Sequence, residues 1–311
     1  MNRFNNRVLP GLFCVFVFAV LMFMSGCKTK PIVPPPPPPP DDPFASLHFE
    51  SVEANEITKI YLDFILTVKN PGHENADMII ENWDIIINDM EIKKGFDFFI
   101  DNSTDKYGFS VVPGTDAFPG AREIPVRLEL DVPALIAEGM PVRDDLIVDL
   151  ALDIFHVNNV RGQEPPVLIR AAETAVFPYI REPVFTITSI AILQAELINT
   201  RFRVGIKIDN PNHFPVDLSS LEYELYGNGL LWADGRERNI ISVPAKSSVQ
   251  GNLFLLMNFI NMKRDLLDQI IRLDDVNYGF NGEALVTTGV EYLPRFRTEF
   301  NLSGYSKVFE N

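Results

Sequence analysis

The chain has 311 residues, of which 46% are hydrophobic and 22% charged, as in a folded protein long enough for two domains with separate cores. Its 27 Lys and Arg against 42 Asp and Glu give a formal charge of -15, which argues against a sequence-independent grip on nucleic acid phosphates. The acidic balance also disfavours adhesion to anionic lipid headgroups, so contact with a membrane would need another route.

The first 26 residues have the pattern of an export signal. Arg3 and Arg7 precede an apolar run at residues 11–24, which is short for a membrane-spanning helix, and small residues follow. Met24-Ser25-Gly26-Cys27 resembles the lipobox of bacterial lipoproteins, although such motifs usually carry Leu where Met24 stands. The resemblance implies a signal peptide at 1–26 and lipidation of Cys27. The alternatives are an uncleaved anchor and a plain signal with a chance Cys.

Cysteine usage agrees with the lipoprotein interpretation. The two cysteines are Cys14, inside the signal, and Cys27, so the mature body is expected to contain no other thiol. Lys28 stands where inner-membrane lipoproteins commonly carry Asp. We therefore expect a protein anchored through Cys27 in the outer membrane of a diderm host, facing the periplasm.

Residues 27–43 are predicted to be a linker. Seven consecutive prolines at 34–40 favour a polyproline II rod, about 20 Å long at roughly 3.1 Å per residue. The rod would hold the folded part away from the membrane. A docking ligand for an aromatic groove is the alternative.

The rest of the chain contains an internal repeat. Residues 199–232 align with residues 59–92 at a constant offset of 140, which places Asn210-Pro211 on Asn70-Pro71, His213 on His73 and Tyr223 on Trp83. One folding unit used twice explains this, and we predict domains at 44–180 and 181–311.

The repeated segment alternates apolar and polar residues. Period-two patterns at 62–68 and 202–208 indicate strands with one buried face, and each stops at Asn-Pro, where Asn can close an Asx turn. The next strands are predicted at 83–87 and 221–226. Asn228-Gly229 then favours a type I′ hairpin, and Asn88-Asp89 is a weaker version of that turn.

Further strands and one helix complete each copy. Helical spacing is short at 133–142 and fuller at 258–273. With six or seven strands per copy, the pattern predicts a mainly β fold of two immunoglobulin/fibronectin-III-like β-sandwiches, each with one helix. The additional strands are expected at 124–132, 145–157, 167–179, 249–257, 277–289 and 296–308.

The second copy carries a family signature. Its segment IKIDNPNHFPVDLSSLEYELYGNG, at 206–229, resembles the type 2 late embryogenesis abundant domain, also called the water stress and hypersensitive response (WHy) domain. The first copy keeps Asn70-Pro71 and Trp83 but departs in between, at GHENADMII. The resemblance implies a small β-sandwich of plant stress proteins and exported bacterial proteins, which serves as a binding or scaffolding module and not as an enzyme.

Catalytic chemistry finds little support. No G-x-S-x-G motif is present, and the four histidines are His48, His73, His156 and His213. His73 and His213 could suggest a metal or pH site, but their matching places after Asn-Pro favour polar turn residues. We predict no catalytic residue, cofactor or metal.

Three other features have simpler interpretations. Asp101, Ser103 and Asp105 space their oxygens like a calcium loop, but Lys106 and Val112 stand where Gly and Glu are needed, which favours an acidic surface loop. Adjacent carboxylates point apart, so a general acid/base pair is a weak interpretation of Asp144-Asp145 and Asp274-Asp275. Trp83 and Tyr223 are expected in the cores.

The expected function is that of a non-enzymatic lipoprotein presenting two binding, scaffolding or stress-protective modules at the cell envelope. An envelope protein or an apolar ligand is the expected partner, besides the membrane itself. The alternative is a carrier or chaperone of lipid or other apolar ligands, held in a sandwich interior or under a lid formed by residues 259–273. A hydrolase is a further alternative, for which no motif is present.

Overall fold

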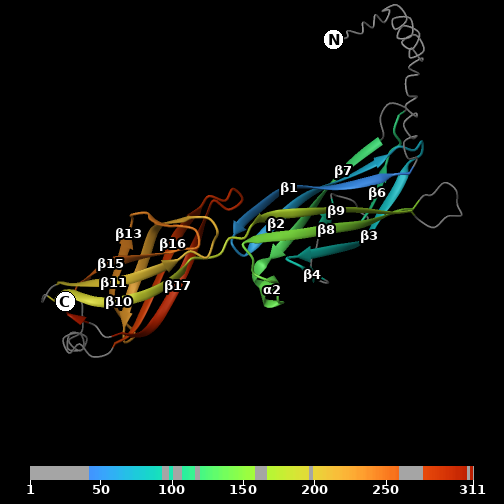
Figure 1. The fold of residues 1–311 in the computed structure, drawn as a ribbon. Helices are drawn as coiled ribbons and strands as arrows, with labels where there is room; N and C mark the ends of the chain where they lie inside the picture. Colours follow the sequence, from blue (N-terminus) through green and yellow to red (C-terminus); the bar gives the residue numbers. More distant parts are fainter. Residues whose placement is uncertain are drawn as a thin grey trace, which may run out of the picture. The chain divides into compact units, whose positions relative to one another are not determined.

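The structure is a computed structural model that describes residues 42–92, 98–100, 107–115, 120–157, 167–195, 199–258, 276–306 and 309–310. Residues Asp41–Asn311 form one compact unit built almost entirely of β-strands (Figure 1). Several predictions lie outside the described residues: the signal, Cys27, the proline run, the residues from Asp101 to Asp105, the helix at 259–273 and Asp274-Asp275.

The first sandwich packs two sheets around one core. One sheet has the strand order β1-β2-β7-β5 and the other β4-β3-β8-β9, with β6 beside β3. The elements are β1 (Phe44–Glu56), β2 (Lys59–Asn70), β3 (Ala76–Ile87), β4 (Met90–Ile92), β5 (Phe98–Ile100), β6 (Gly108–Val111), β7 (Gly120–Asp131), α2 (Val132–Ala137), β8 (Asp145–His156) and β9 (Val167–Pro178).

The second sandwich repeats this plan. Its sheets have the orders β15-β11-β10-β18 and β13-β12-β16-β17, with β14 beside β12. The elements are β10 (Val184–Ala195), β11 (Asn199–Asp209), β12 (Val216–Gly227), β13 (Leu230–Glu237), β14 (Ile241–Val243), β15 (Ser248–Asn258), β16 (Val276–Thr288), β17 (Arg295–Ser306) and β18 (Phe309–Glu310). Tandem β-sandwiches, the predicted fold class, are confirmed.

Each core is filled by alternate residues of the central strands. On β2 the buried residues are Ile60, Leu62, Phe64, Leu66 and Val68, while the residues between them are only partly buried. On β11, Phe202, Val204, Ile206 and Ile208 are buried in the same way. Alternate side chains of a strand point to opposite faces, so this period-two pattern places one complete face of each strand in the core.

The Asn-Pro pairs form the corners after these strands. Asn70 and Asn210 are both buried, and their side-chain Oδ1 atoms accept bonds from the backbone N–H of Gly72 at 3.0 Å and of Asn212 at 2.9 Å. These are the predicted Asx turns. The Asn70 amide also donates to carbonyl groups of Glu74 and Val111, which ties the corner to β6.

Both predicted hairpin turns have type I′ geometry. Asn88 and Asp89 have φ values of 48° and 69°, and Asn228 and Gly229 have φ values of 49° and 79°. A type I′ turn needs positive φ at both central residues. The weaker Asn-Asp signal of the first copy therefore gives the same turn as the Asn-Gly of the second.

The strands β1 and β10 were not predicted. In the pairing of β1 with β2, register shifts fall between Phe49 and Ser51 and between Ala54 and Glu56, and β10 has two similar shifts against β11. Each bulge reverses which residues face the core, so the alternation of apolar residues is lost along these strands.

The described residues contain one short helix, α2. Asp131 caps it by accepting a bond from the Ala134 N–H at 3.0 Å, and Pro133 occupies its first turn. The short helix predicted for the first copy is thus present. Among the described residues, no helix has the length and apolar character needed to cross a bilayer.

Candidate interaction site at the junction

The two sandwiches meet at the short segment between β9 and β10, and Asn212 holds that segment in place. The backbone N–H of Arg181 donates to Oδ1 of Asn212 at 2.8 Å, and Nδ2 of Asn212 donates to the Arg181 carbonyl at 2.8 Å. Asn212 is fully buried. The corner of the second copy therefore binds the segment between β9 and β10, whereas the first copy has Gly72 in place of Asn212.

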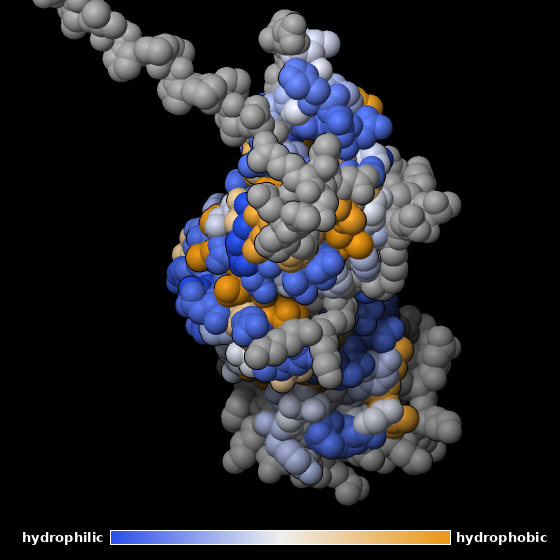
Figure 2. All heavy atoms as spheres, turned by 90° about the vertical axis from the view of Figure 1, so that its right-hand side faces the viewer, coloured by the Kyte–Doolittle hydropathy of each residue, from blue (hydrophilic) through white to orange (hydrophobic). Residues whose placement is uncertain are grey.

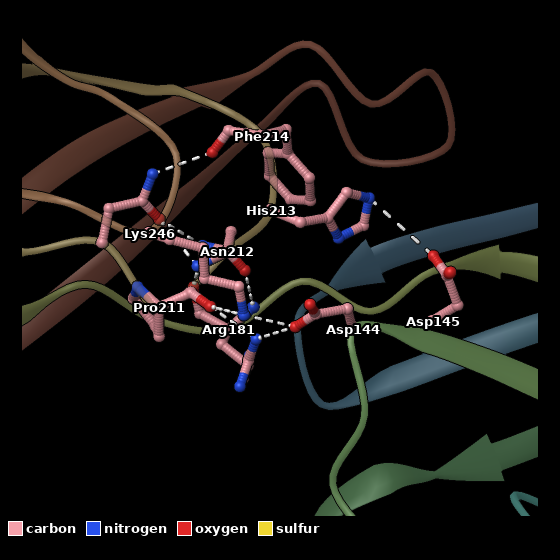
Figure 3. A network of polar contacts seen from close by, with 9 residues as sticks. Asp144, Asp145, Arg181, Pro211, Asn212, His213, Phe214 and Lys246 are labelled. Atoms are coloured by element: carbon pink, nitrogen blue, oxygen red, sulfur yellow. Dashed lines mark hydrogen bonds and ion pairs between the residues drawn. The ribbon is translucent and has the colours of Figure 1, made fainter.

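Asp144 lies at the centre of a charged network (Figure 3). Nη2 of Arg181 lies 2.6 Å from Oδ1 of Asp144, and Nζ of Lys246 contacts the same oxygen. The hydrogen bond from Lys246, together with the charges of both cations, lowers the pKa of Asp144. Lys246 also donates to the Pro211 carbonyl at 2.9 Å. Asp144 belongs to the first sandwich and Lys246 to the second, so this network joins them.

Tyr292, in the loop between β16 and β17, makes the second set of contacts across the junction. Its hydroxyl donates to the Pro178 carbonyl at 2.6 Å, and its ring packs edge-on against Phe177 with centroids 5.7 Å apart. The Tyr292 hydroxyl is protonated at neutral pH and can donate, and burial raises its pKa further above the ordinary value of 10. Tyr292 and Ala54 pack against both hydrophobic cores.

A groove of about 1000 Å³ lies beside these contacts. It is lined by residues 49–55 of β1, residues 176–178 of β9, His213 with Phe214, and residues 289–292 of the loop after β16. Val176 is 57% exposed there, while Phe177 is buried. The groove thus combines an edge strand, aromatic side chains and several carboxylates, and both sandwiches contribute to it.

Two smaller grooves lie on the outer faces of the sheets. One, of about 510 Å³, is lined by residues of β12, β13, β16 and β17, and the other, of about 690 Å³, by residues of β3, β4, β8 and β9. Their linings are rich in Asp and Glu. Figure 2 shows polar residues, in blue, with apolar residues scattered between them on the face turned to the viewer.

The histidines fall on separate elements. His48 is on the exposed face of β1 and His156 ends β8, while His73 and His213 occupy the predicted turns. Nε2 of His213 lies 3.8 Å from Oδ1 of Asp145 across the junction. Within the described ranges, His, Cys, Asp and Glu side chains form no group of three or more that could hold a metal ion.

The remaining residues singled out from the sequence have structural positions. Tyr223 is buried and lies 5.6 Å from Phe280 between ring centroids, and Trp83 is partly buried against Tyr107 at 5.5 Å. Asp144 and Asp145 point to different partners, so they do not act as a carboxylate pair.

Sequence reasoning missed Arg181, Lys246 and Tyr292 as junction residues. The sequence signal for the junction is the difference between Asn-Pro-Asn in the second copy and Asn-Pro-Gly in the first. Asn212 has a side chain that can bind the segment between β9 and β10, and Gly72 has none.

Comparison with known families identifies the second sandwich. The model of the family described as late embryogenesis abundant protein, LEA type 2, matches residues 205–295. This match supports an LEA type 2 domain in the second sandwich. The match begins on β11 and ends at the start of β17, so it contains the Asn210 corner, the hairpin at Asn228 and the Lys246 and Tyr292 sides of the junction.

No curated protein matches the chain. Among solved structures, a protein from Archaeoglobus fulgidus is 18% identical, with 40% of this chain and 97% of that chain covered, at a TM-score of 0.25. A glycosyl hydrolase family 2 member from Bacteroides cellulosilyticus is 10% identical, with 79% of this chain and 31% of that chain covered, at a TM-score of 0.24. A bacterial adhesin from Mobiluncus mulieris is 6% identical, with 79% of this chain and 80% of that chain covered, at a TM-score of 0.28. At these TM-scores the likeness carries no inference about function.

Proposed function

We propose that this protein is a non-enzymatic lipoprotein of the cell envelope that presents two LEA type 2-like sandwiches as a binding or scaffolding module. Cys27 anchors the chain, the proline run lifts it from the membrane, and the first sandwich is a divergent copy of the LEA type 2 domain. The membrane would be the outer membrane of a diderm host, with the sandwiches in the periplasm. Protection of other proteins during water stress is one use of such a module.

The observation that carries this proposal is the junction. The Asp144 network and the Tyr292 contacts bring both sandwiches to one groove, so the two domains form a joint surface instead of two independent units. Binding sites occur preferentially at interfaces between domains. The LEA type 2 match supports a binding role, because the resemblance implies a module without catalytic chemistry.

The alternative of an apolar ligand carrier receives less support. Large side chains such as Phe64, Phe202 and Phe280 fill the described cores, with no exposed surface. The three grooves are lined by outer-face or junction residues, not by the space between the sheets of one sandwich. The lid expected at 259–273 lies outside the described residues.

Fatty-acid labelling in a diderm bacterium tests the anchor. The full-length chain should incorporate labelled palmitate and sediment with membranes, and Cys27→Ala should lose the label. Cys14→Ala is the matched control, because this second cysteine lies within the proposed signal, and it should label like the wild type. Equal labelling of Cys27→Ala and wild type, or no labelling of either, would contradict the anchor.

A further inference from the structure

The outer edge of β1 offers backbone hydrogen-bonding groups to the groove. β1 is the first strand of its sheet and pairs with β2 on one side. On the other side, the Ala54 N–H donates to the Tyr292 carbonyl at 3.3 Å. The register is regular from Ser51 to Ala54, so the Val52 N–H points away from β2, to the same side as that of Ala54. The edge therefore already donates a main-chain hydrogen bond at one position.

The second sandwich shows how such an edge is used. β18 pairs in parallel with β10, opposite Ala191 and Ile192. The repeat offset of 140 places these residues on Ser51 and Val52 of β1, and both of these line the groove. An extended segment therefore occupies on β10 the edge that on β1 faces the groove. Among the described residues, no strand hydrogen-bonds to β1 on that side, although β9 lies close to β1.

The lining of the groove indicates the chemistry of its occupant. Val176, Phe214 and Tyr292 supply apolar surface along the edge. Glu50 and Glu291 are exposed at the groove, and neither makes an ion pair with any described residue, whereas Glu53 pairs with Arg127 at 3.1 Å. Two carboxylates without an ion-pair partner in the described part of the chain, beside an apolar edge, favour a segment that alternates apolar with basic residues.

We propose that β1 binds an extended segment of a partner protein, rich in alternating apolar and basic residues, as an added strand in the junction groove. The backbone of the segment bonds to the outer edge at Val52, its apolar side chains contact Val176 and Tyr292, and its basic side chains face Glu50 and Glu291. This inference rests on the proposed binding function, for which it names the surface and the partner class.

Peptide binding by the full-length chain in mild detergent tests the proposal. The probe is a fluorescent, end-capped seven-residue peptide that alternates valine with lysine and threonine, followed by fluorescence anisotropy. A version with glutamate in place of lysine should bind at least about tenfold more weakly. Two further versions are N-methylated on one or the other alternate set of backbone nitrogens. Only methylation of the backbone nitrogens that face β1 should abolish binding. This result distinguishes addition of a strand from binding through side chains alone.

Variants of the chain locate the binding edge. Val52→Pro removes an outward N–H on an edge strand, where proline is tolerated, and should weaken binding of the basic peptide about tenfold or more. Ala45→Pro lies on the same strand outside the groove and serves as the matched control. Circular dichroism and the melting temperature show whether each variant folds.

A charge variant gives a second measurement that does not depend on strand geometry. Glu50→Gln with Glu291→Gln should weaken the basic peptide several-fold and reduce the salt dependence of binding. Glu299→Gln, an exposed carboxylate on β17 that is not in the junction groove, should leave both unchanged.

The proposal is overturned if no peptide binds, if basic and acidic versions bind equally, or if folded Val52→Pro binds like the wild type. Cys27→Ala should bind the peptide normally, because the groove is built from residues 49–292. Loss of palmitate label with normal peptide binding is therefore the result expected for Cys27→Ala. Failure of the anchor would appear in the labelling experiment and failure of the groove in the peptide assay.

Discussion

At the scale of single residues, the two asparagines of the Asn-Pro pairs, Asn70 and Asn210, form the same kind of turn but make different numbers of hydrogen bonds. Both are buried where water cannot satisfy an amide, and each bonds to the backbone of its own turn and of the next edge strand. Asn210 adds two bonds, to the Pro244 carbonyl and from the Asn212 side chain. A buried amide with every group paired specifies one conformation of the corner.

We expect Asn210→Ala to lower the free energy of unfolding by about 2–4 kcal/mol, because it leaves buried backbone groups without partners. Asn70→Ala should have a smaller effect, since Asn70 makes fewer of these bonds. Urea unfolding measures both. Asn301→Ala, at an exposed position of β17, should change stability by no more than about 0.5 kcal/mol. An Asn210→Ala protein as stable as this control would contradict the assigned role.

At the scale of elements, most strands and turns were predictable from the sequence, but the bulged strands β1 and β10 were not. The central strands β2 and β11 bury one face, so burial imposes period two on their residues. The strands β1 and β10 contain bulges that break this period. The corner asparagines were predictable as turn residues, but their bonds to β6 and to the segment after β14 join residues distant in sequence, for which one sequence carries no local signal.

The hairpin after β3 gives a prediction for a turn. Asp89 has a φ of 69°, in the left-handed region, where glycine is unstrained, as at Gly229 in the second copy. Asp89→Gly relieves this strain but loses the exposed ion pair with Arg143, so it should stabilise the protein by less than about 1 kcal/mol, whereas Gly229→Asp should destabilise it by about 1 kcal/mol. Thermal unfolding of the two variants checks the pair. Changes of the same sign in both variants would be inconsistent with matching turns.

At the scale of the whole molecule, the joint surface depends on long-range contacts. Arg181, in the segment between β9 and β10, forms an ion pair with Asp144, and Lys246 contacts the same carboxylate from a turn in the second sandwich. These residues are far apart in sequence and belong to no chemical motif, so the repeat predicted two domains but not the surface that they share.

The Asp144 network makes a pH-dependent contribution to stability. Its pKa in the folded protein is lowered from 3.8, so the ionised carboxylate stabilises the fold above that pH, and the contribution is lost as the pH falls through the lowered pKa. We expect Asp144→Asn to lower the melting temperature by about 1–3 °C at pH 7, because exposed ion pairs contribute little.

The difference between wild type and Asp144→Asn should stay constant from about pH 5 to 8 and shrink below about pH 4. High salt should reduce it at every pH. Melting curves over this range measure it, and a difference that grows as the pH falls would be the wrong sign for this network.

The most direct test of an anchored binding module is site-specific photocrosslinking of the full-length chain in living cells of a diderm bacterium. A photoreactive amino acid at Val176, in the junction groove, is compared with one at Val157, an exposed residue that directly follows β8. We expect discrete protein adducts at position 176 that disappear with Val52→Pro and with Cys27→Ala, and none at position 157. The same adducts at both positions, or adducts at 176 that are unaffected by Val52→Pro and Cys27→Ala, would contradict the proposed function.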